Sequence, residues 1–149
     1  MKNFLYVLMV GGLLASGLHS ATAATKKEPK KKRVETRLRV KDQVTVVGSV
    51  VFTPKSGGRL KIDVIVANGA PAKTFKVEFS YAVVGKPAPS IPSLIGHLET
   101  DQEGTGKGHY QVDLSSIARL TIIPSVYLED VRPSKVIPYL SDDVTVELE

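Results

Sequence analysis

The sequence predicts an all-β protein, namely an antiparallel β-sandwich of about seven or eight short strands. Apolar and polar residues alternate with a period of two over much of residues 34–149, as expected for strands with one face on a core. Turn-forming residues interrupt this alternation at spacings of roughly 8–12 residues, which is typical of sandwiches. Only Ser115–Leu120 is compatible with a helical turn, and no long repeat indicates a solenoid or a propeller.

The first three strands are expected where the alternation is clearest. In Val34–Val40, apolar residues and Thr36 point to one face and charged residues to the other. Val44–Thr53 is rich in valine on both faces, which favours a central strand. Pro54–Gly58 predicts a turn, and Leu60–Val66 then returns to strict alternation.

A second hairpin is expected around Asn68–Pro71, because Asn-Gly is a strong signal for a tight turn between strands. Phe75–Val83 follows as a strand with aromatic and valine residues on its inner face. Gly85–Pro92 contains three prolines and cannot be an interior strand. We interpret this segment as a long connection between sheets.

The C-terminal half is expected to hold a hairpin and a final strand. Gly96–Asp101 and Gly108–Leu114 flank a glycine-rich tip and are predicted to pair with each other. Leu120–Ile123 and Val126–Val131 are either two short strands or one strand broken at Pro124. Val144–Leu148 is predicted to close the domain as a last strand.

Residues 1–23 have the pattern of a cleavable export signal. Lys2 precedes the uncharged apolar run Phe4–Leu18, and Ala21 and Ala23 form a cleavage pattern before Ala24. The run is shorter than the ~20 residues that span a bilayer, so no transmembrane segment is expected after cleavage. The alternative is an uncleaved N-terminal anchor. The sequence therefore predicts an exported protein, periplasmic or extracellular, whose folded domain spans residues 34–149.

Basic charge is concentrated just before this domain. Residues 24–41 carry a net charge of +7, whereas residues 42–149 carry −3. The segment 24–33 has no apolar residue beyond Ala24 to bury and is predicted to be a disordered arm. It is either a solvated spacer or a site for an anionic polymer of the envelope. Its lack of aromatic residues argues against specific nucleic-acid recognition. The predicted polyanion-binding residues are Lys26, Lys27, Lys30, Lys31, Lys32 and Arg33.

A metal site is the second candidate. If the predicted hairpin turns near Thr105, Asp101 lies opposite His109, and His97 shares a face with Asp101. Imidazole and carboxylate groups are ligands for Zn²⁺ or Cu²⁺. His97, Asp101 and His109 are therefore the predicted metal ligands. The alternative is an ordinary solvent-facing hairpin with oppositely charged cross-strand pairs.

No residue pattern indicates catalysis or a bound cofactor. The chain has no cysteine, which excludes disulfides, thiolate nucleophiles and cysteine-based metal sites. The serines are not in a nucleophile-elbow context, and no glycine-rich loop opening a helix is available for phosphate. We expect no enzymatic activity and no resident cofactor.

One stretch resembles small exported bacterial β-sandwich domains. Its hairpin Gly96-His97-Leu98-Glu99-Thr100-Asp101, followed by Gly104 and Gly106, has the form G-x-L-x-T-D-x-x-G-x-G. Such hairpins are similar to those of immunoglobulin-like and superoxide-dismutase-like sandwiches, and the resemblance extends over Val47–Leu114. It implies a fold and no activity, because a dismutase requires a histidine cluster that this chain lacks.

Taken together, these patterns favour a non-enzymatic binding or structural module of the cell envelope or extracellular space. The basic arm would attach it to an anionic polymer, and the sheet edges or the proline-rich loop would contact a protein partner. The alternative is a periplasmic metal-binding protein that uses the hairpin of His97 and His109.

Overall fold

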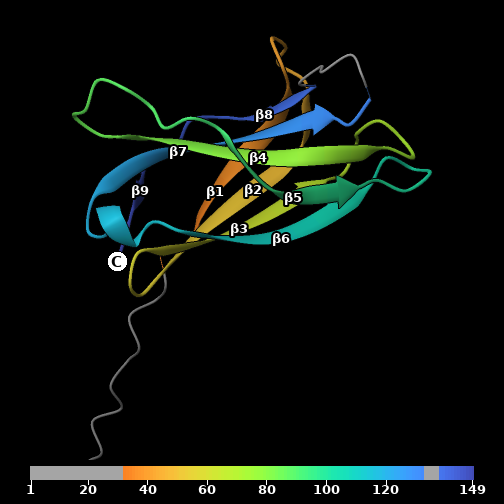
Figure 1. The fold of residues 1–149 in the computed structure, drawn as a ribbon. Coiled ribbons are helices and arrows are strands. Elements are labelled where there is room, and N and C mark those ends of the chain that lie inside the picture. Colours follow the sequence, from red (N-terminus) through yellow and green to blue (C-terminus); the bar gives the residue numbers. More distant parts are fainter. Residues whose placement is uncertain (1–31, 133–137) are drawn as a thin grey trace, which may run out of the picture.

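A computed structural model describes residues 32–132 and 138–149 and confirms that the fold is all-β and antiparallel (Figure 1). A single turn of 3₁₀-helix, η1 (Ser115–Ile117), lies in the segment where one helical turn was expected. The strands are β1 (Val34–Val40), β2 (Val46–Lys55), β3 (Arg59–Val66), β4 (Thr74–Val83), β5 (Ser93–Glu99), β6 (Gly106–Asp113), β7 (Thr121–Asp130), β8 (Tyr139–Ser141) and β9 (Val146–Glu147).

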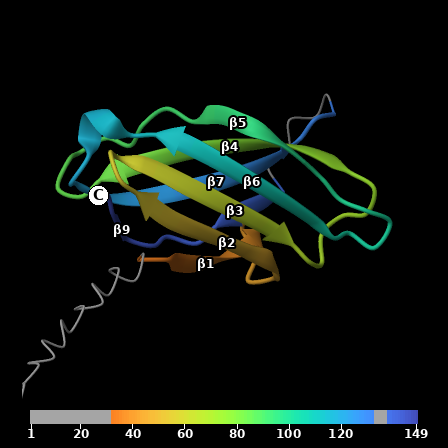
Figure 2. The same cartoon turned by 90° about the horizontal axis from the view of Figure 1, so that it is seen from below.

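The strands form two layers that are joined into one sheet. The pairing order is β5-β4-β7-β8-β1-β2-β3-β6, and β9 pairs with β7 beside this path. Figures 1 and 2 show β5, β4 and β7 in one layer and β1, β2, β3 and β6 in the other. The short strand β8 pairs with both β7 and β1, so it connects the layers along one side. The architecture therefore lies between a sandwich and a barrel.

The core is filled by alternate residues of both layers, as the period-two pattern predicts. In β3, four fully buried apolar side chains alternate with residues that retain partial exposure. In β4, Phe75, Val77 and Phe79 face the same interior. The largest fully buried side chains are Phe52, Phe75, Leu38, Leu60, Ile62, Leu98, Ile122 and Leu128. Burial of this apolar surface is the main stabilising contribution to the fold.

Two prolines lie inside strands, which corrects the expected break at Pro124 and the expected turn at Pro54. β7 runs without interruption from Thr121 to Asp130. The N–H of Val126 points away from β4 and donates to the Ser141 hydroxyl. Pro124, two residues earlier, directs its nitrogen to the same side, between β8 and β9, where no ladder bond is lost. Pro54 lies beyond the part of β2 that pairs with β1.

The C-terminal segment closes the side of the molecule between β1 and β7. The sequence pattern does not predict β8, and of Val144–Leu148 only Val146 and Glu147 are in strand conformation. Val146 and Leu148 are nonetheless buried in the core. The N–H of Leu148 donates to the Leu120 carbonyl at 3.0 Å, and the N–H of Gly58 donates to the Glu149 carbonyl at 2.8 Å. The segment thus contacts both layers.

Candidate polyanion-binding surface and histidine pair

The two strands expected to form the histidine hairpin pair with other partners. β5 pairs with β4, which places His97 beside Lys76. β6 pairs with β3, which places His109 beside Asp63. The predicted register, with His109 opposite Asp101, is therefore wrong. Both strands carry clear alternation, but alternation determines which face a residue occupies and not which strand lies beside it.

His109 and Asp63 form a close pair on the outer face of the sheet. The Nδ1 atom of His109 lies 2.6 Å from Oδ1 of Asp63, and Lys61 Nζ lies 3.0 Å from the same carboxylate. Partial burial raises the pKa of Asp63, but the hydrogen bonds from His109 and Lys61 outweigh it and hold the pKa below its usual value. Asp63 was not among the predicted site residues, because its partner lies 46 positions further along the chain.

Asp101 has a structural role at the tip between β5 and β6. Its Oδ1 accepts hydrogen bonds from the backbone N–H groups of Glu103 and Thr105, both at 2.9 Å. Gly104 follows with a φ of 77°, which favours glycine. Within residues 32–132 and 138–149, no three histidine, aspartate or glutamate side chains are gathered to hold a metal ion. The structure therefore does not bring His97, Asp101 and His109 together as a ligand set.

Only the last two of the predicted polyanion-binding residues are described. Lys32 forms an ion pair with Glu147, next to the start of β1. Arg33 is exposed and directly precedes Val34. The other predicted residues of this group, Lys26, Lys27, Lys30 and Lys31, lie outside the described part of the chain.

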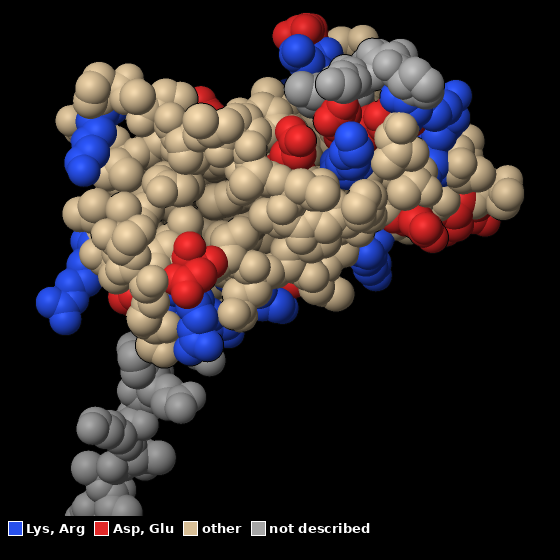
Figure 3. All heavy atoms as spheres, in the orientation of Figure 1, with Lys and Arg blue, Asp and Glu red and all other residues tan. Residues whose placement is uncertain are grey.

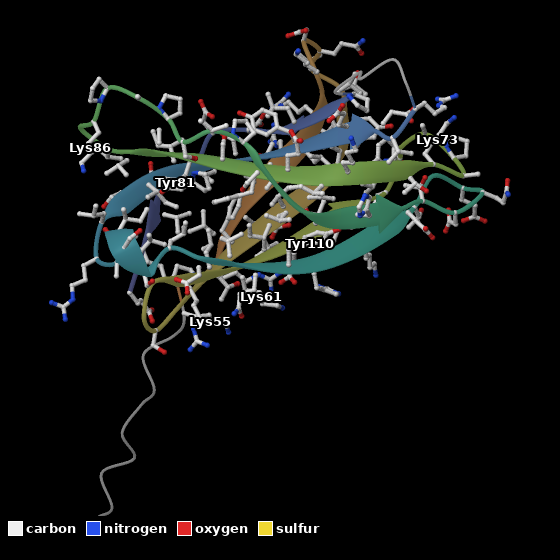
Figure 4. All side chains as sticks on the ribbon, viewed as in Figure 1. Lys55, Lys61, Lys73, Tyr81, Lys86 and Tyr110 are labelled. Carbon is white, nitrogen blue, oxygen red and sulfur yellow. The ribbon has the colours of Figure 1, made fainter. Side chains whose placement is uncertain are left out.

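The outer face of β1, β2, β3 and β6 carries further basic residues. The register places Arg37, Ser49, Ile65 and Lys107 in one row across the four strands. Lys55 and Arg59 face each other at the far end of β2 and β3. Figure 4 shows Lys55 and Lys61 on the lower side of this layer, away from the core. The basic side chains on this face are Arg37, Lys55, Arg59, Lys61 and Lys107, against the acidic Glu35, Asp63 and Asp113.

A shallow cleft of about 390 Å³ lies at the junction of β1 and β8 and was not predicted, because β8 itself was not. Arg39 lines it, and its Nε donates to the Asp142 carboxylate at 2.7 Å. Its Nη1 donates to the Val44 carbonyl at 3.0 Å. The guanidinium is thus used to hold the loop after β1 against the loop after β8, which is a structural role.

Comparison with protein-family models, with curated proteins and with solved structures finds no significant match. No helix in the described part of the chain is long and apolar enough to span a membrane. The resemblance of the Gly96–Gly106 hairpin to exported β-sandwich domains stays a prediction.

Proposed function

We propose that this protein is an exported, non-enzymatic binding or structural module that attaches to an anionic polymer of the cell envelope through the basic arm at residues 24–33. The arm combines six lysine and arginine side chains with one glutamate. A segment with this density of positive charge binds polyanions by releasing their counterions, with little need for a shaped site.

The observation that carries this proposal is where the arm joins the fold. Arg33 leads directly into β1, whose outward positions belong to the outer face of β1, β2, β3 and β6. On that face basic side chains outnumber acidic ones, although residues 42–149 as a whole carry a net charge of −3. The folded face that adjoins the arm therefore carries more basic than acidic side chains, which widens the area that a polyanion can contact.

The test is co-sedimentation of the protein, purified after export, with an envelope fraction over a series of salt concentrations. We expect binding at low salt and release as salt rises. Substitution of Lys26, Lys30 and Lys31 by glutamine is expected to weaken binding and to reduce its salt dependence. The matched control replaces Lys41, Lys73 and Lys76 by glutamine, which removes the same charge elsewhere in the chain. If the two triple variants bind the envelope fraction equally and with the same salt dependence, the arm is a spacer.

Metal binding is the second candidate function, and the His109–Asp63 contact is the observation that favours it. These two groups supply a nitrogen and an oxygen ligand at 2.6 Å from each other. Native mass spectrometry after addition of Zn²⁺, Cu²⁺ and Ca²⁺ tests this possibility. A retained ion that disappears in His109→Ala supports it, and a protein without bound metal under all three conditions removes it.

A further inference from the structure

Three connections meet at the end of the molecule where the arm enters β1. They are the turn 56–58, the proline-rich loop 84–92 and the segment 114–120, and together we call them the arm-end loops. The N–H of Val84 donates to the Thr121 carbonyl at 3.0 Å, and the N–H of Leu114 donates to the Gly58 carbonyl at 2.9 Å. Figures 1 and 2 show the three connections at the same end as the start of β1.

The charged side chains of the arm-end loops are all basic. Lys86 is the single charged residue of loop 84–92, and Arg119 is the single charged residue of segment 114–120. Lys55 lies directly before the turn 56–58, and Figure 4 shows Lys86 at the outer end of its loop. In Figure 3 blue side chains project from the left end of the molecule, and red side chains lie at its lower left.

Acidic residues also lie near these loops, and Glu149 is beside the turn 56–58, where its carbonyl accepts a hydrogen bond from the N–H of Gly58 at 2.8 Å. Glu147 forms its ion pair with Lys32. The Asp113 carboxylate accepts a hydrogen bond from the N–H of Ser115 at 2.8 Å, which holds the pKa of Asp113 below its usual value. Lys86 in loop 84–92 and Arg119 in segment 114–120 supply the charge that complements an anionic partner.

The same loops hold apolar side chains in solvent. Ile91 is 89% exposed, Val84 is 53% exposed and Leu120 is 36% exposed. An exposed isoleucine beside basic residues contributes nothing to binding a hydrated polymer. It does stabilise contact with a lipid surface, because its side chain becomes buried among the lipids.

The base of loop 84–92 is held firmly, so Ile91 is presented at a defined position. The N–H of Ser90 donates to the Tyr81 carbonyl at 2.6 Å, and its hydroxyl accepts from the N–H of Tyr81 at 2.8 Å. The N–H of Lys86 donates to the Val83 carbonyl at 3.0 Å. Three prolines further restrict the loop backbone. Little conformational entropy is therefore lost when the loop contacts a partner.

We propose that the arm-end loops dock on an anionic lipid bilayer, with Ile91 and Val84 at the boundary between headgroups and acyl chains. Lys86 and Arg119 then lie against the headgroup phosphates. This inference rests on the proposed function, because the arm and the loops would act on one surface from one end of the molecule. The inference identifies the anionic partner of the proposed function as lipid.

The experiment uses the protein purified after export, with its N-terminus read by mass spectrometry. Ile91→Trp introduces the first tryptophan into a chain that has none. On vesicles of phosphatidylglycerol and phosphatidylcholine we expect the emission of this tryptophan to shift to the blue, and on phosphatidylcholine alone we expect no shift. The control is Val44→Trp, at a valine that is 85% exposed in the turn at the other end of β1. Its emission is expected to stay unchanged with both kinds of vesicle.

A second pair of variants measures affinity. Ile91→Ser is expected to weaken binding to the anionic vesicles on the order of tenfold, the effect of losing one buried isoleucine, and Val44→Ser to leave it unchanged. Both sites are exposed, so thermal unfolding of the variants should match that of the parent protein.

The outcomes separate the two proposals. If Ile91→Trp shows no shift and Ile91→Ser binds normally while the arm variant still loses envelope binding, docking on lipid is overturned and attachment by the arm stands. If Ile91→Ser loses binding while the arm variant binds normally, the role of the arm is overturned and lipid docking stands. Sedimentation with envelope material but not with anionic vesicles also overturns lipid docking.

Discussion

The hydroxyl group of Tyr110 in β6 donates a hydrogen bond to the carbonyl oxygen of His97 in β5, 2.7 Å away. These strands end the pairing order of the sheet and face each other across its open side. The Tyr110 ring covers two glycines, since a Cβ on Gly108 would lie 2.1 Å from its hydroxyl and a Cβ on Gly96 would lie 2.6 Å from its ring. One side chain therefore bridges the two edges.

Removal of this bridge is expected to destabilise the domain. Tyr110→Phe keeps the ring and loses the hydroxyl donor, which should lower the free energy of unfolding by about 1 kcal/mol. Urea denaturation followed by circular dichroism measures the difference. Gly108→Ala should already displace the ring. Tyr110→Phe should therefore lower the free energy of unfolding much less in the Gly108→Ala background than it does in the parent protein. Fully additive effects of the two substitutions would contradict this bridge.

The same tyrosine predicts a loss of stability at high pH. Burial raises the pKa of Tyr110 from 10.0 to about 12 in the folded protein. A raised folded pKa stabilises the fold below the unfolded value of 10.0, and this contribution is lost as pH rises through about 12. Over this pH range the free energy of unfolding should fall more steeply with pH for the parent protein than for Tyr110→Phe, and urea denaturation at each pH measures it. Identical slopes would show that Tyr110 ionises freely.

The neighbouring glycines of the turn between β2 and β3 provide a matched pair of substitutions. Both have left-handed φ angles, 75° for Gly57 and 73° for Gly58. A Cβ on Gly57 meets nothing within 4 Å, whereas a Cβ on Gly58 would lie 2.7 Å from the Cα of Ser115. Gly57→Ala should cost about 1 kcal/mol from backbone strain alone, and Gly58→Ala about 2 kcal/mol or more. Thermal unfolding of the two variants measures the two losses of stability. A larger loss for Gly57→Ala than for Gly58→Ala would be inconsistent with the close packing of the turn on η1.

The Asp63–His109 contact predicts that the stability of the domain depends on pH in the acidic range. The folded pKa of Asp63 is lowered from 3.8, so its contribution is present above pH 3.8 and is lost as pH falls through the lower folded value. Asp63→Asn should therefore destabilise the domain by roughly 0.5–1 kcal/mol near neutral pH, and the difference should shrink as the pH falls below 3.8. Asp143→Asn, at an exposed aspartate, is the control. A difference that does not change with pH would contradict this interpretation.

The C-terminal segment predicts a contrast between adjacent positions. Leu148 is buried in the core, whereas Glu147 is exposed. Leu148→Ala should lower the free energy of unfolding by roughly 2–5 kcal/mol through the cavity that it leaves. Glu147→Ala should change it by no more than about 0.5 kcal/mol. Denaturant titration of both variants checks this, and a small effect at Leu148 would mean that the segment does not seal the core.

Local features of the fold were predictable, and long-range features were not. The alternation in Leu60–Val66 and Phe75–Val83 indicated strand type and inner face correctly, because both follow from the pleat alone. β8 is too short to produce a recognisable period.

The candidate site shows the same limit. The basic arm was visible because its charge is contiguous in sequence. The outer face that adjoins it is assembled from four strands, and the pairing of His109 with Asp63 depends on β3 lying beside β6. The sequence pattern had paired β6 with β5 because those two strands are adjacent along the chain. Strand neighbours of this kind are set by packing of the whole core.

The placement of Val146 and Leu148 in the core has a consequence for how the chain is made. Synthesis proceeds from the N-terminus, so β1, β2 and β3 can form their hairpins while the rest of the sequence is still being added. The side between β1 and β7 stays open until residues 146–148 have left the ribosome, because they supply its closing side chains. The nascent chain thus exposes apolar surface until these residues have left the ribosome, and during that interval a chaperone can still bind it.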